Sequence, residues 1–302
     1  MSSALTQTNL PHLTLLSKGK VRDIYEAGSD HLLFVASDRI SAYDVILNNG
    51  IPEKGQLLTK VSLFWFEKLK HIIPNHFVTA NIDEMPEEVR QYREQLEGRT
   101  MLVKKANVVP LEAIVRGYLT GSAWSEYKAS GTVHGIPLPE GMQESQKFPE
   151  PIFTPSTKAD QGSHDENISP EKAAKLVGEH LYKKITTAAL RLYSEAAEYA
   201  LSKGIILADT KFEFGLIGEE LILVDELLTP DSSRYWPLEG YTVGVSQPSF
   251  DKQYLRDWLV RSGFKKGLEG GLKDGEGWTI DEDIVKGTRQ RYTDVVDMLI
   301  GS

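Results

Sequence analysis

LADTKFEFG, residues 207–215, is the most informative stretch of this sequence. Alternate residues of a β-strand point to opposite faces of a sheet, so the charged side chains of Asp209, Lys211 and Glu213 would share one face. The two phenylalanines of the stretch would share the other face. The pattern therefore predicts a strand with one charged face and one face buried in the core.

A second strand is expected at residues 221–226, after a turn that contains Gly218. A three-residue loop at 218–220 would place Asp225 directly opposite Glu213. Two opposed carboxylates repel each other unless a cation lies between them, and oxygen ligands suit a Mg²⁺ ion that bridges nucleotide phosphates. A two-residue turn would move Asp225 to the other face. A solvated hairpin with alternating charges explains the pattern alone equally well.

The rest of the chain predicts an α+β fold. Before residue 108, strand-like segments alternate with turns, which is typical of an antiparallel sheet. Apolar periodicity and end signals predict helices at residues 57–69, 86–96, 170–203, 251–261 and 279–299. The longest has Ser169 as its N-cap, and the last has a capping box of Thr279 and Glu282. Residues 137–169 lack apolar periodicity and are expected to form a long loop.

We expect the chain to have three parts. Residues 1–108 would form a nucleotide-binding lobe, residues 109–250 a substrate- and metal-binding lobe, and residues 251–302 a C-terminal helical segment. A nucleotide-sized cleft is expected between the two lobes. The glycine-rich residues 267–277 are expected to connect the last two helices.

The composition excludes several classes of function. The chain has 302 residues, with 34 Lys and Arg against 43 Asp and Glu, and its net charge of -9 would repel a polyanion. It has no cysteine, which excludes disulfides, thiol nucleophiles and cysteine-based zinc sites. Its seven histidines form no HExxH motif, which argues against a histidine-bound metal.

No targeting or membrane segment is expected. The longest apolar runs fall far short of the roughly 20 residues that span a bilayer, and the first residues lack the pattern of a secretory signal. We therefore expect a cytoplasmic protein with no nucleic-acid or membrane partner, present as a monomer or a small homo-oligomer.

Several predicted turns combine cations with hydroxyl groups. SKGKVRD at residues 17–23 could cover phosphates with its backbone N–H groups, although a basic surface turn is the alternative. Arg116 could form a forked contact with a phosphate beside Ser122, or it could form a buried ion pair with Glu112. Similar clusters occur at residues 37–44, 156–160, 165–167 and 231–234. In an acidic protein these turns predict a local anion site.

Together these segments resemble the SAICAR synthetase family of purine biosynthesis. Both hallmark stretches of that family are present, as VPLEAIVRGYLTGS at residues 109–122 and LADTKFEFG at residues 207–215. KGKVRD, SDRISAYD, STKAD, DENIS and LVDELLTPDSSRYW extend the resemblance from about Leu15 to Arg256. The length and the long middle segment are similar to the longer form of the family.

The resemblance implies a two-lobed α+β fold with antiparallel sheets, an ATP cleft between the lobes and C-terminal helices. It also implies an ATP-dependent ligase that joins L-aspartate to the carboxylate of CAIR, a phosphoribosyl aminoimidazole carboxylate. The products would be SAICAR, ADP and phosphate. The family is thought to phosphorylate the carboxylate before the amine attacks, so positioning and charge neutralisation would do most of the catalysis.

The resemblance further implies a set of site residues and the cofactors ATP and Mg²⁺. The implied ATP-binding residues are Lys18, Gly19, Lys20, Arg22, Leu102, Lys104 and Glu112. The implied metal ligands are Glu213 and Asp225, which with Lys20 and Lys211 form the implied catalytic group. The residues implied for the CAIR phosphate are Arg116, Ser122, Lys211, Ser232, Ser233 and Arg234. L-aspartate, which needs cations and donors for two carboxylates, is assigned to Asp38, Arg39, Ser156 and Lys158.

Two main alternatives remain, and a metal-free module that binds a sugar phosphate is a remote third. A small-molecule kinase would use the same phosphate loop and metal carboxylates but would need no amine. A nucleotide-binding regulatory protein without turnover is the other alternative, although the presence of Lys211, Glu213 and Asp225 argues against it.

Overall fold

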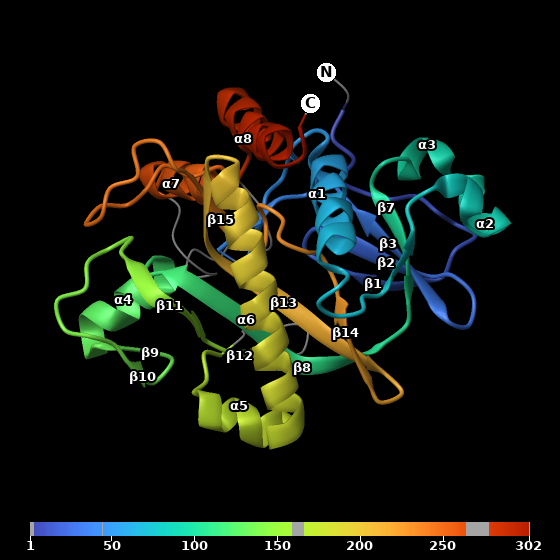
Figure 1. The fold of residues 1–302 in the computed structure, drawn as a ribbon. Helices are drawn as coiled ribbons and strands as arrows, with labels where there is room; N and C mark the ends of the chain where they lie inside the picture. Colours follow the sequence, from blue (N-terminus) through green and yellow to red (C-terminus); the bar gives the residue numbers. More distant parts are fainter. Residues whose placement is uncertain (1–2, 44, 159–165, 264–277, 302) are drawn as a thin grey trace. The chain divides into compact units, whose positions relative to one another are not determined.

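The computed structural model describes residues 3–43, 45–158, 166–263 and 278–301. The predicted connection at 267–277 lies outside these ranges. The chain divides into two compact units, the first made of residues 1–64, 76–105 and 250–302 and the second of residues 65–75 and 106–249. Helices and antiparallel strands occur in both units, which confirms the α+β class (Figure 1). The expected division at residues 108 and 250 into three functional parts stays a prediction.

The first unit contains an antiparallel five-stranded sheet in the order β1-β2-β3-β7-β6, as predicted for the first part of the chain. Its strands are β1 (Leu15–Lys18), β2 (Arg22–Glu26), β3 (His31–Ala36), β6 (Phe77–Thr79) and β7 (Thr100–Lys104), and a separate pair is formed by β4 (Ser41–Ala42) and β5 (Val45–Ile46). The central strand β3 is a nearly continuous apolar run, and its Leu33 and Val35 are completely buried. This burial explains why β3 lies in the middle of the sheet.

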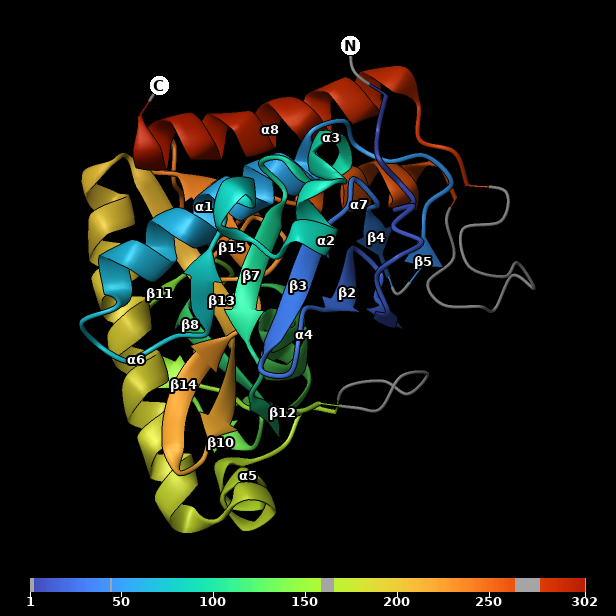
Figure 2. The ribbon, with the colours of Figure 1, turned by 90° about the vertical axis from the view of Figure 1, so that its right-hand side faces the viewer.

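The first unit also contains helices. They are α1 (Lys54–Leu69), whose last turn belongs to the second unit, the short 3₁₀ helix η1 (Ile82–Glu84), α2 (Glu87–Arg90), α3 (Arg93–Leu96), α7 (Gln253–Arg261) and α8 (Glu282–Ile300). In Figure 2, α8 runs alongside α1, and Arg289 of α8 forms an ion pair with Glu53. The predicted capping box is wrong because α8 begins later than expected, with Asp281 as N-cap and no side-chain cap.

The second unit is built on a six-stranded sheet. Its strands are β8 (Asn107–Tyr118), β11 (Lys147–Phe153), β12 (Ser156–Thr157), β13 (Ile205–Ile217), β14 (Glu220–Val224) and β15 (Ser233–Pro237), with a separate hairpin of β9 (Thr132–Val133) and β10 (Ile136–Pro137). The order is β11-β8-β13-β14, while β12 pairs with β8 and β15 pairs with β13. The long strands β8 and β13 therefore lie at the centre, and they carry the two hallmark stretches.

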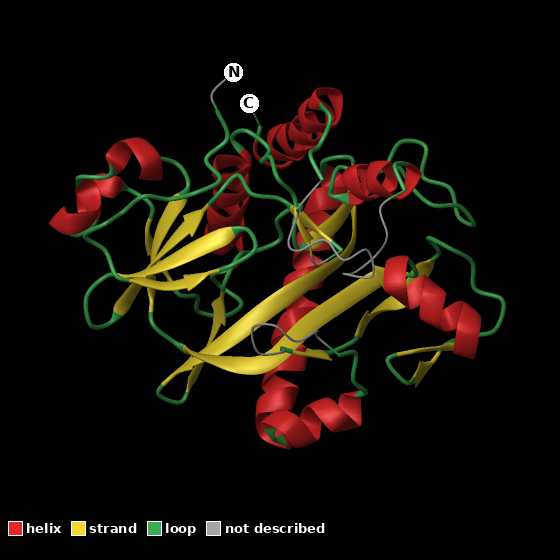
Figure 3. Ribbon diagram, turned by 180° about the vertical axis from the view of Figure 1, so that it is seen from behind, coloured by secondary structure: helices red, strands yellow, loops and turns green. Residues whose placement is uncertain are grey.

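One face of this sheet is covered by a long helix. The helices of the unit are α4 (Gly121–Ser130), α5 (Pro170–Val177) and α6 (Glu179–Ser202). Seen from behind, the strands of the sheet lie in front of α6 (Figure 3). The Tyr193 hydroxyl of α6 donates to the Leu207 carbonyl oxygen at 2.6 Å. Gly117 of β8 makes room for this hydroxyl, because a Cβ there would lie 1.9 Å from it.

Three predicted elements differ from the structure. The helix at 170–203 is interrupted at Gly178, whose φ of +87° breaks it into α5 and α6. The helix at 86–96 consists of the single turns α2 and α3. The predicted loop at 137–169 contains β11 and β12, because an edge strand tolerates proline and polar residues that a central strand does not.

Candidate active site

Charged side chains from neighbouring strands meet near the centre of the six-stranded sheet. Glu112 of β8 lies directly opposite Glu213 of β13. The Lys211 ammonium contacts the Glu112 carboxylate and lies 3.1 Å from Glu213 Oε1. Lys158 contacts the other oxygen of Glu213, and the Ser156 hydroxyl donates to Glu112 Oε2 at 3.2 Å. We call Glu112, Lys158, Lys211 and Glu213 the carboxylate-lysine cluster.

The surrounding charges determine the protonation state of Lys211. Burial disfavours the ammonium, but the carboxylates of Glu213, Glu112 and Asp225 outweigh this effect and raise the pKa of Lys211 above its ordinary value. About a third of the side chain, 33%, is exposed. Lys211 is therefore an ammonium ion at neutral pH. It can neutralise developing negative charge, but it cannot accept a proton as a general base.

Asp225 acts on this cluster, but its strand pairing and backbone conformation differ from those considered in the sequence analysis. Glu213 is opposite Val224, and Ile217 is opposite Glu220, so the hairpin loop has only two residues. Of the two turns that the sequence left open, the hairpin therefore has the two-residue turn, and Asp225 does not lie directly opposite Glu213. Asp225 follows the end of β14 with φ of +69°, a left-handed conformation that breaks the alternation of the strand. Its charge still acts on Lys211.

A second charged group spans three strands of the same sheet. Asp209 of β13 lies opposite both Arg116 of β8 and Arg234 of β15. Its Oδ2 atom accepts from Arg116 Nη1 at 3.0 Å and from Arg234. Arg116 is almost fully buried and also donates to Thr154 Oγ1 at 3.0 Å, whereas 24% of the Arg234 side chain is exposed. We call Arg116, Asp209 and Arg234 the arginine row.

Arg234 lies against the first turn of α4. A Cβ atom at Gly121 would come within 2.4 Å of Arg234 Nη2, and Gly121 has φ of +60°. Only glycine combines this close approach with this backbone conformation at low cost. Ser122 is exposed in the same turn. The N-terminus of a helix carries partial positive charge, so Arg234, Ser122 and α4 form a surface suited to an anion.

The two serines before Arg234 differ in their surroundings. Ser233 is buried, and its hydroxyl lies 2.7 Å from that of Thr210. Ser232 is half-buried and its hydroxyl donates to the Thr229 carbonyl oxygen at 3.3 Å. Both residues thus directly precede Arg234, the exposed end of the arginine row, and Ser232 is the more accessible of the two.

The alternative of a Glu112 to Arg116 ion pair is wrong. Both residues lie on β8, where a separation of four residues amounts to about 13 Å. Each therefore finds its partner on β13, Glu112 at Lys211 and Arg116 at Asp209. Lys211, predicted beside Arg116 and Arg234, has its ammonium in the carboxylate-lysine cluster instead.

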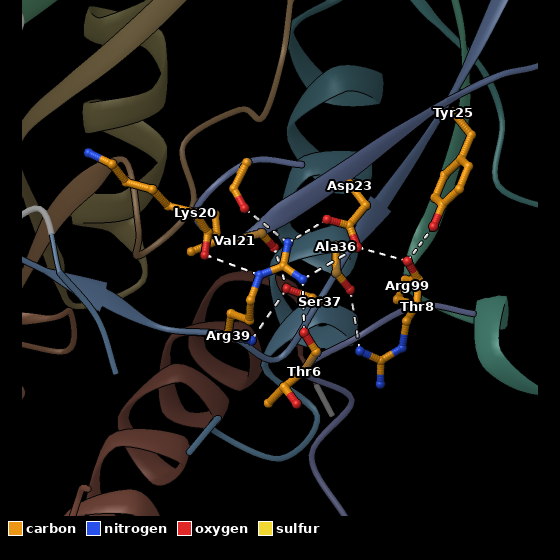
Figure 4. A network of polar contacts seen from close by, with 11 residues as sticks. Thr6, Thr8, Lys20, Val21, Asp23, Tyr25, Ala36, Ser37, Arg39 and Arg99 are labelled. Atoms are coloured by element: carbon orange, nitrogen blue, oxygen red, sulfur yellow. Dashed lines mark hydrogen bonds and ion pairs between the residues drawn. The ribbon is translucent and has the colours of Figure 1, made fainter. Parts of the chain in front are cut away.

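The predicted phosphate loop lies in the first unit, between β1 and β2. Lys18 and Lys20 are exposed, and Gly19 and Arg22 are half-buried. The nearby Arg39 and Asp38 are buried, with 5% and 0% exposure. Figure 4 shows Arg39 within a network of polar contacts. Arg39 binds Asp23, while Asp38 binds Arg99 and accepts from the backbone N–H groups of Leu5 and Gly55.

The strand predicted to contact adenine is β7. Leu102 is buried and lies opposite Leu33 of β3 on one side and Thr79 of β6 on the other. Lys104 is exposed, and its backbone N–H donates to the His76 carbonyl oxygen at 2.8 Å. The adenine contact stays a prediction, as do the ligand-binding roles of all the predicted site residues.

The sequence profile of the SAICAR synthetase family matches residues 15–270. The chain belongs to this family. Its relatives include phosphoribosylaminoimidazole-succinocarboxamide synthases from Maridesulfovibrio salexigens, 52% identical over 100% of this chain and 99% of the relative, and from Pichia angusta, 56% identical over 98% of each chain. A solved structure of SAICAR synthase from Saccharomyces cerevisiae, complexed with SAICAR, matches with a TM-score of 0.89 and 52% identity over 99% of each chain.

The donor atoms of this SAICAR synthetase suit Mg²⁺. Among the described residues, no three or more His, Asp and Glu side chains are grouped as a metal cage. Glu213 and Asp225 offer carboxylate oxygens beside the same ammonium, and Mg²⁺ commonly uses one or two carboxylates together with substrate phosphates. The residues therefore fit a shared metal and nucleotide site.

Sequence reasoning missed that Asp209 joins the two arginines of the arginine row in this SAICAR synthetase. Its position on the charged face of the LADTKFEFG strand was recognised, but its two arginine partners were not. The available signal was the alternation that puts Asp209 two residues before Lys211. Pairing it with Arg116 and Arg234 requires the register of three strands, which the sequence does not specify.

None of the helices in the described ranges combines the length and apolar character needed to cross a membrane. The cytoplasmic location and the oligomeric state stay predictions.

Proposed function

We propose that this chain is a phosphoribosylaminoimidazole-succinocarboxamide synthase that uses ATP to join L-aspartate to CAIR. The observation that carries the proposal is the presence of the carboxylate-lysine cluster and the arginine row on one sheet. Together they provide a site for metal and nucleotide next to a site for a phosphate monoester. Family membership and the close match to a SAICAR-bound relative support the same activity.

The chemistry requires an activated carboxylate. The carboxylate of CAIR is a poor acyl donor, and phosphoryl transfer from ATP gives an acyl phosphate whose phosphate the aspartate amine displaces. The first step depends on positioning and charge neutralisation. Glu213 and Asp225 would hold Mg²⁺, which supplies Lewis-acid chemistry and neutralises charge.

Lys211 neutralises charge in this reaction and does not remove a proton. Its ammonium lies between two carboxylates and keeps its proton at neutral pH, as the raised pKa shows. It can therefore stabilise negative oxygens of the transferring phosphoryl group or of the CAIR carboxylate. Glu112 positions this ammonium from the opposite strand.

The arginine row binds the phosphate of CAIR. Arg234 provides the exposed guanidinium, and Ser122 and the first turn of α4 provide further donors. Ser232 and Ser233 lie next to Arg234 on the same segment. Arg116 acts through Asp209, because its own guanidinium is buried against Asp209 and Thr154.

Ser156 and Lys158 form part of the aspartate site. Ser156 lies on β12 and Lys158 directly follows that strand. The two side chains contact the two opposed glutamates, so a carboxylate of L-aspartate could replace Glu213 as the partner of Lys158. If Lys158→Ala leaves the KM for L-aspartate unchanged while activity is measurable, this assignment is wrong. Asp38 and Arg39, expected at the same site, are buried within the first unit, and their contact with aspartate stays a prediction.

The turn of Lys18, Gly19, Lys20 and Arg22 covers the ATP phosphates. Its cations are exposed or half-buried, which suits phosphate oxygens, whereas the backbone N–H of Gly19 donates to the Arg22 carbonyl oxygen at 2.7 Å.

The deciding experiment measures ADP release with Mg²⁺ and ATP, adding CAIR and L-aspartate separately and together, with mass analysis of the product. Turnover that requires both substrates and yields SAICAR supports the ligase. Turnover with CAIR alone indicates a kinase or an uncoupled acyl phosphate. ATP binding without turnover in any combination indicates a regulatory protein.

A further inference from the structure

The predicted phosphate loop of the first unit contains a turn at residues 19–21, and neighbouring residues bind the carbonyl oxygens of this turn. Arg39 donates to the carbonyl oxygens of Gly19 at 3.0 Å and Lys20 at 3.3 Å. The next carbonyl oxygen, that of Val21, accepts from the backbone N–H and the hydroxyl of Ser37, at 3.0 and 2.8 Å. Three consecutive carbonyl groups of the turn are thus bound by Ser37 and Arg39 (Figure 4).

Arg39 is used to its full capacity as a donor. Besides the two carbonyl oxygens of the turn, it donates to the Thr6 carbonyl oxygen at 2.8 Å and to both carboxylate oxygens of Asp23, at 2.6 and 3.3 Å. A guanidinium has five N–H donors, and these are five acceptors. Only 6% of the Arg39 side chain and 2% of the Asp23 side chain are exposed. Asp23 supplies the counter-charge that lets the guanidinium stay buried.

This arrangement has an electrostatic consequence for the turn. Carbonyl oxygens carry partial negative charge and would repel a phosphate, so binding them to Arg39 and Ser37 directs them away from an anion on the other side. The side chain of Lys20 points away from Arg39, although its carbonyl oxygen points toward it (Figure 4). The turn therefore presents cations on one side and carbonyl groups on the other.

We propose that Arg39 is a positioning residue for ATP, which holds the Gly19 to Val21 turn in its phosphate-binding conformation, rather than a residue that contacts L-aspartate. This inference rests on the proposed function, because it takes ATP as the ligand of the turn. Lysine cannot replace Arg39, since an ammonium has three donors and no planar fork.

The test compares Arg39→Lys with Arg99→Lys. Arg99 is a matched control because it is also buried and paired with a carboxylate, that of Asp38, but has no hydrogen bond to the turn. For each variant we would measure ATP affinity by calorimetry, steady-state constants for all three substrates, thermal stability, and hydrogen exchange of the peptide that contains Gly19 to Arg22.

We expect Arg39→Lys to raise the KM and Kd for ATP about tenfold, with the KM values for CAIR and L-aspartate changed less than about twofold. Amide exchange in the turn should accelerate. Arg99→Lys should lose comparable thermal stability without either change. If Arg39→Lys does not fold, Ser37→Ala tests the same turn more mildly and should raise the KM for ATP about threefold.

Two results would overturn the inference. One is a KM for ATP that rises equally in Arg39→Lys and Arg99→Lys, which would show a general structural effect. The other is a rise in the KM for L-aspartate alone, which would support direct contact with that substrate. A wild-type protein that makes no SAICAR would instead refute the proposed function, and calorimetry with ATP would still report on the turn.

Discussion

Glu112 and Glu213 lie directly opposite each other on the neighbouring strands β8 and β13, and the Lys211 ammonium contacts both carboxylates. Like charges in this position destabilise a sheet unless they are compensated. The cations that provide the compensation are Lys211 and Lys158. The strand register thus holds two carboxylates close together, and the ammonium groups of Lys211 and Lys158 relieve their repulsion.

Glu213→Gln should reduce kcat at least about 100-fold and raise the Mg²⁺ concentration needed for half-maximal activity, because it removes a proposed Mg²⁺ ligand and one partner of Lys211. Mg²⁺ titrations of the rate would measure both effects. Glu220→Gln is the control, since Glu220 is exposed at the start of β14. A Glu213→Gln enzyme with normal Mg²⁺ dependence would exclude Glu213 as a ligand.

Lys211→Met should lower the free energy of unfolding by about 2 kcal/mol, because the two facing glutamates lose the ammonium between them. The folded-state pKa of Lys211 is raised, so its stabilisation is fully present below the unfolded pKa of about 10.4 and is lost only as pH rises through the folded pKa. The difference between wild type and variant should therefore be constant from about pH 7 to 9. Denaturant unfolding at several pH values would measure it, and a difference that vanishes by pH 9 would contradict the raised pKa.

Much of this arrangement could be predicted from the sequence. The alternation in LADTKFEFG correctly gave a strand with a charged face, because period-two patterns report the pleat directly. The position of Asp225 could not be predicted, since it depends on a two-residue loop and one left-handed residue. The edge strand β11 was missed because its prolines and polar residues resemble a loop.

The arginine row shows a second limit of what the sequence can predict, namely which strands become neighbours. A single strand reveals Asp209 on the charged face, but its partners come from strands that lie about 90 residues before it and 25 residues after it. Local patterns carry no information on which strands become neighbours. The family resemblance named Arg116 and Arg234, and only the register assigns them unequal burial.

This unequal burial gives a testable contrast between the two arginines. Arg116→Met should destabilise the protein by about 3 to 5 kcal/mol, because it leaves the buried Asp209 carboxylate without its buried arginine partner. Arg234→Met should cost less stability and raise the KM for CAIR at least about tenfold. Unfolding curves and CAIR kinetics on both variants would check this. Equal effects on stability and KM in the two variants would refute the division of roles.

His134 should make the protein sensitive to acid. Burial lowers its pKa, and its Nδ1 lies 2.8 Å from the Pro155 carbonyl oxygen. The unfolded chain therefore takes up a proton near pH 6.5 that the folded protein resists, so stability falls as pH drops below that value. His134→Asn suits the site because Asn tolerates the φ of +51° found there. Its stability should fall less steeply between pH 7 and 5 than that of wild type, and an unchanged slope would show that His134 is not the group responsible.

Gly121→Ala tests whether close packing against α4 positions Arg234. The new Cβ would lie 2.4 Å from Arg234 Nη2, so the guanidinium must move, and we expect the KM for CAIR to rise at least about fivefold. Gly131→Ala is a matched control, because Gly131 ends the same helix with φ of +70° and a Cβ there would meet no atom within 4 Å. Both variants pay about 1 kcal/mol for a left-handed alanine, so the thermal stability they lose by this strain should be similar. Only the variant at Gly121 displaces Arg234, and a similar rise in the KM for CAIR in both would show that backbone strain in α4, rather than the position of Arg234, limits phosphate binding.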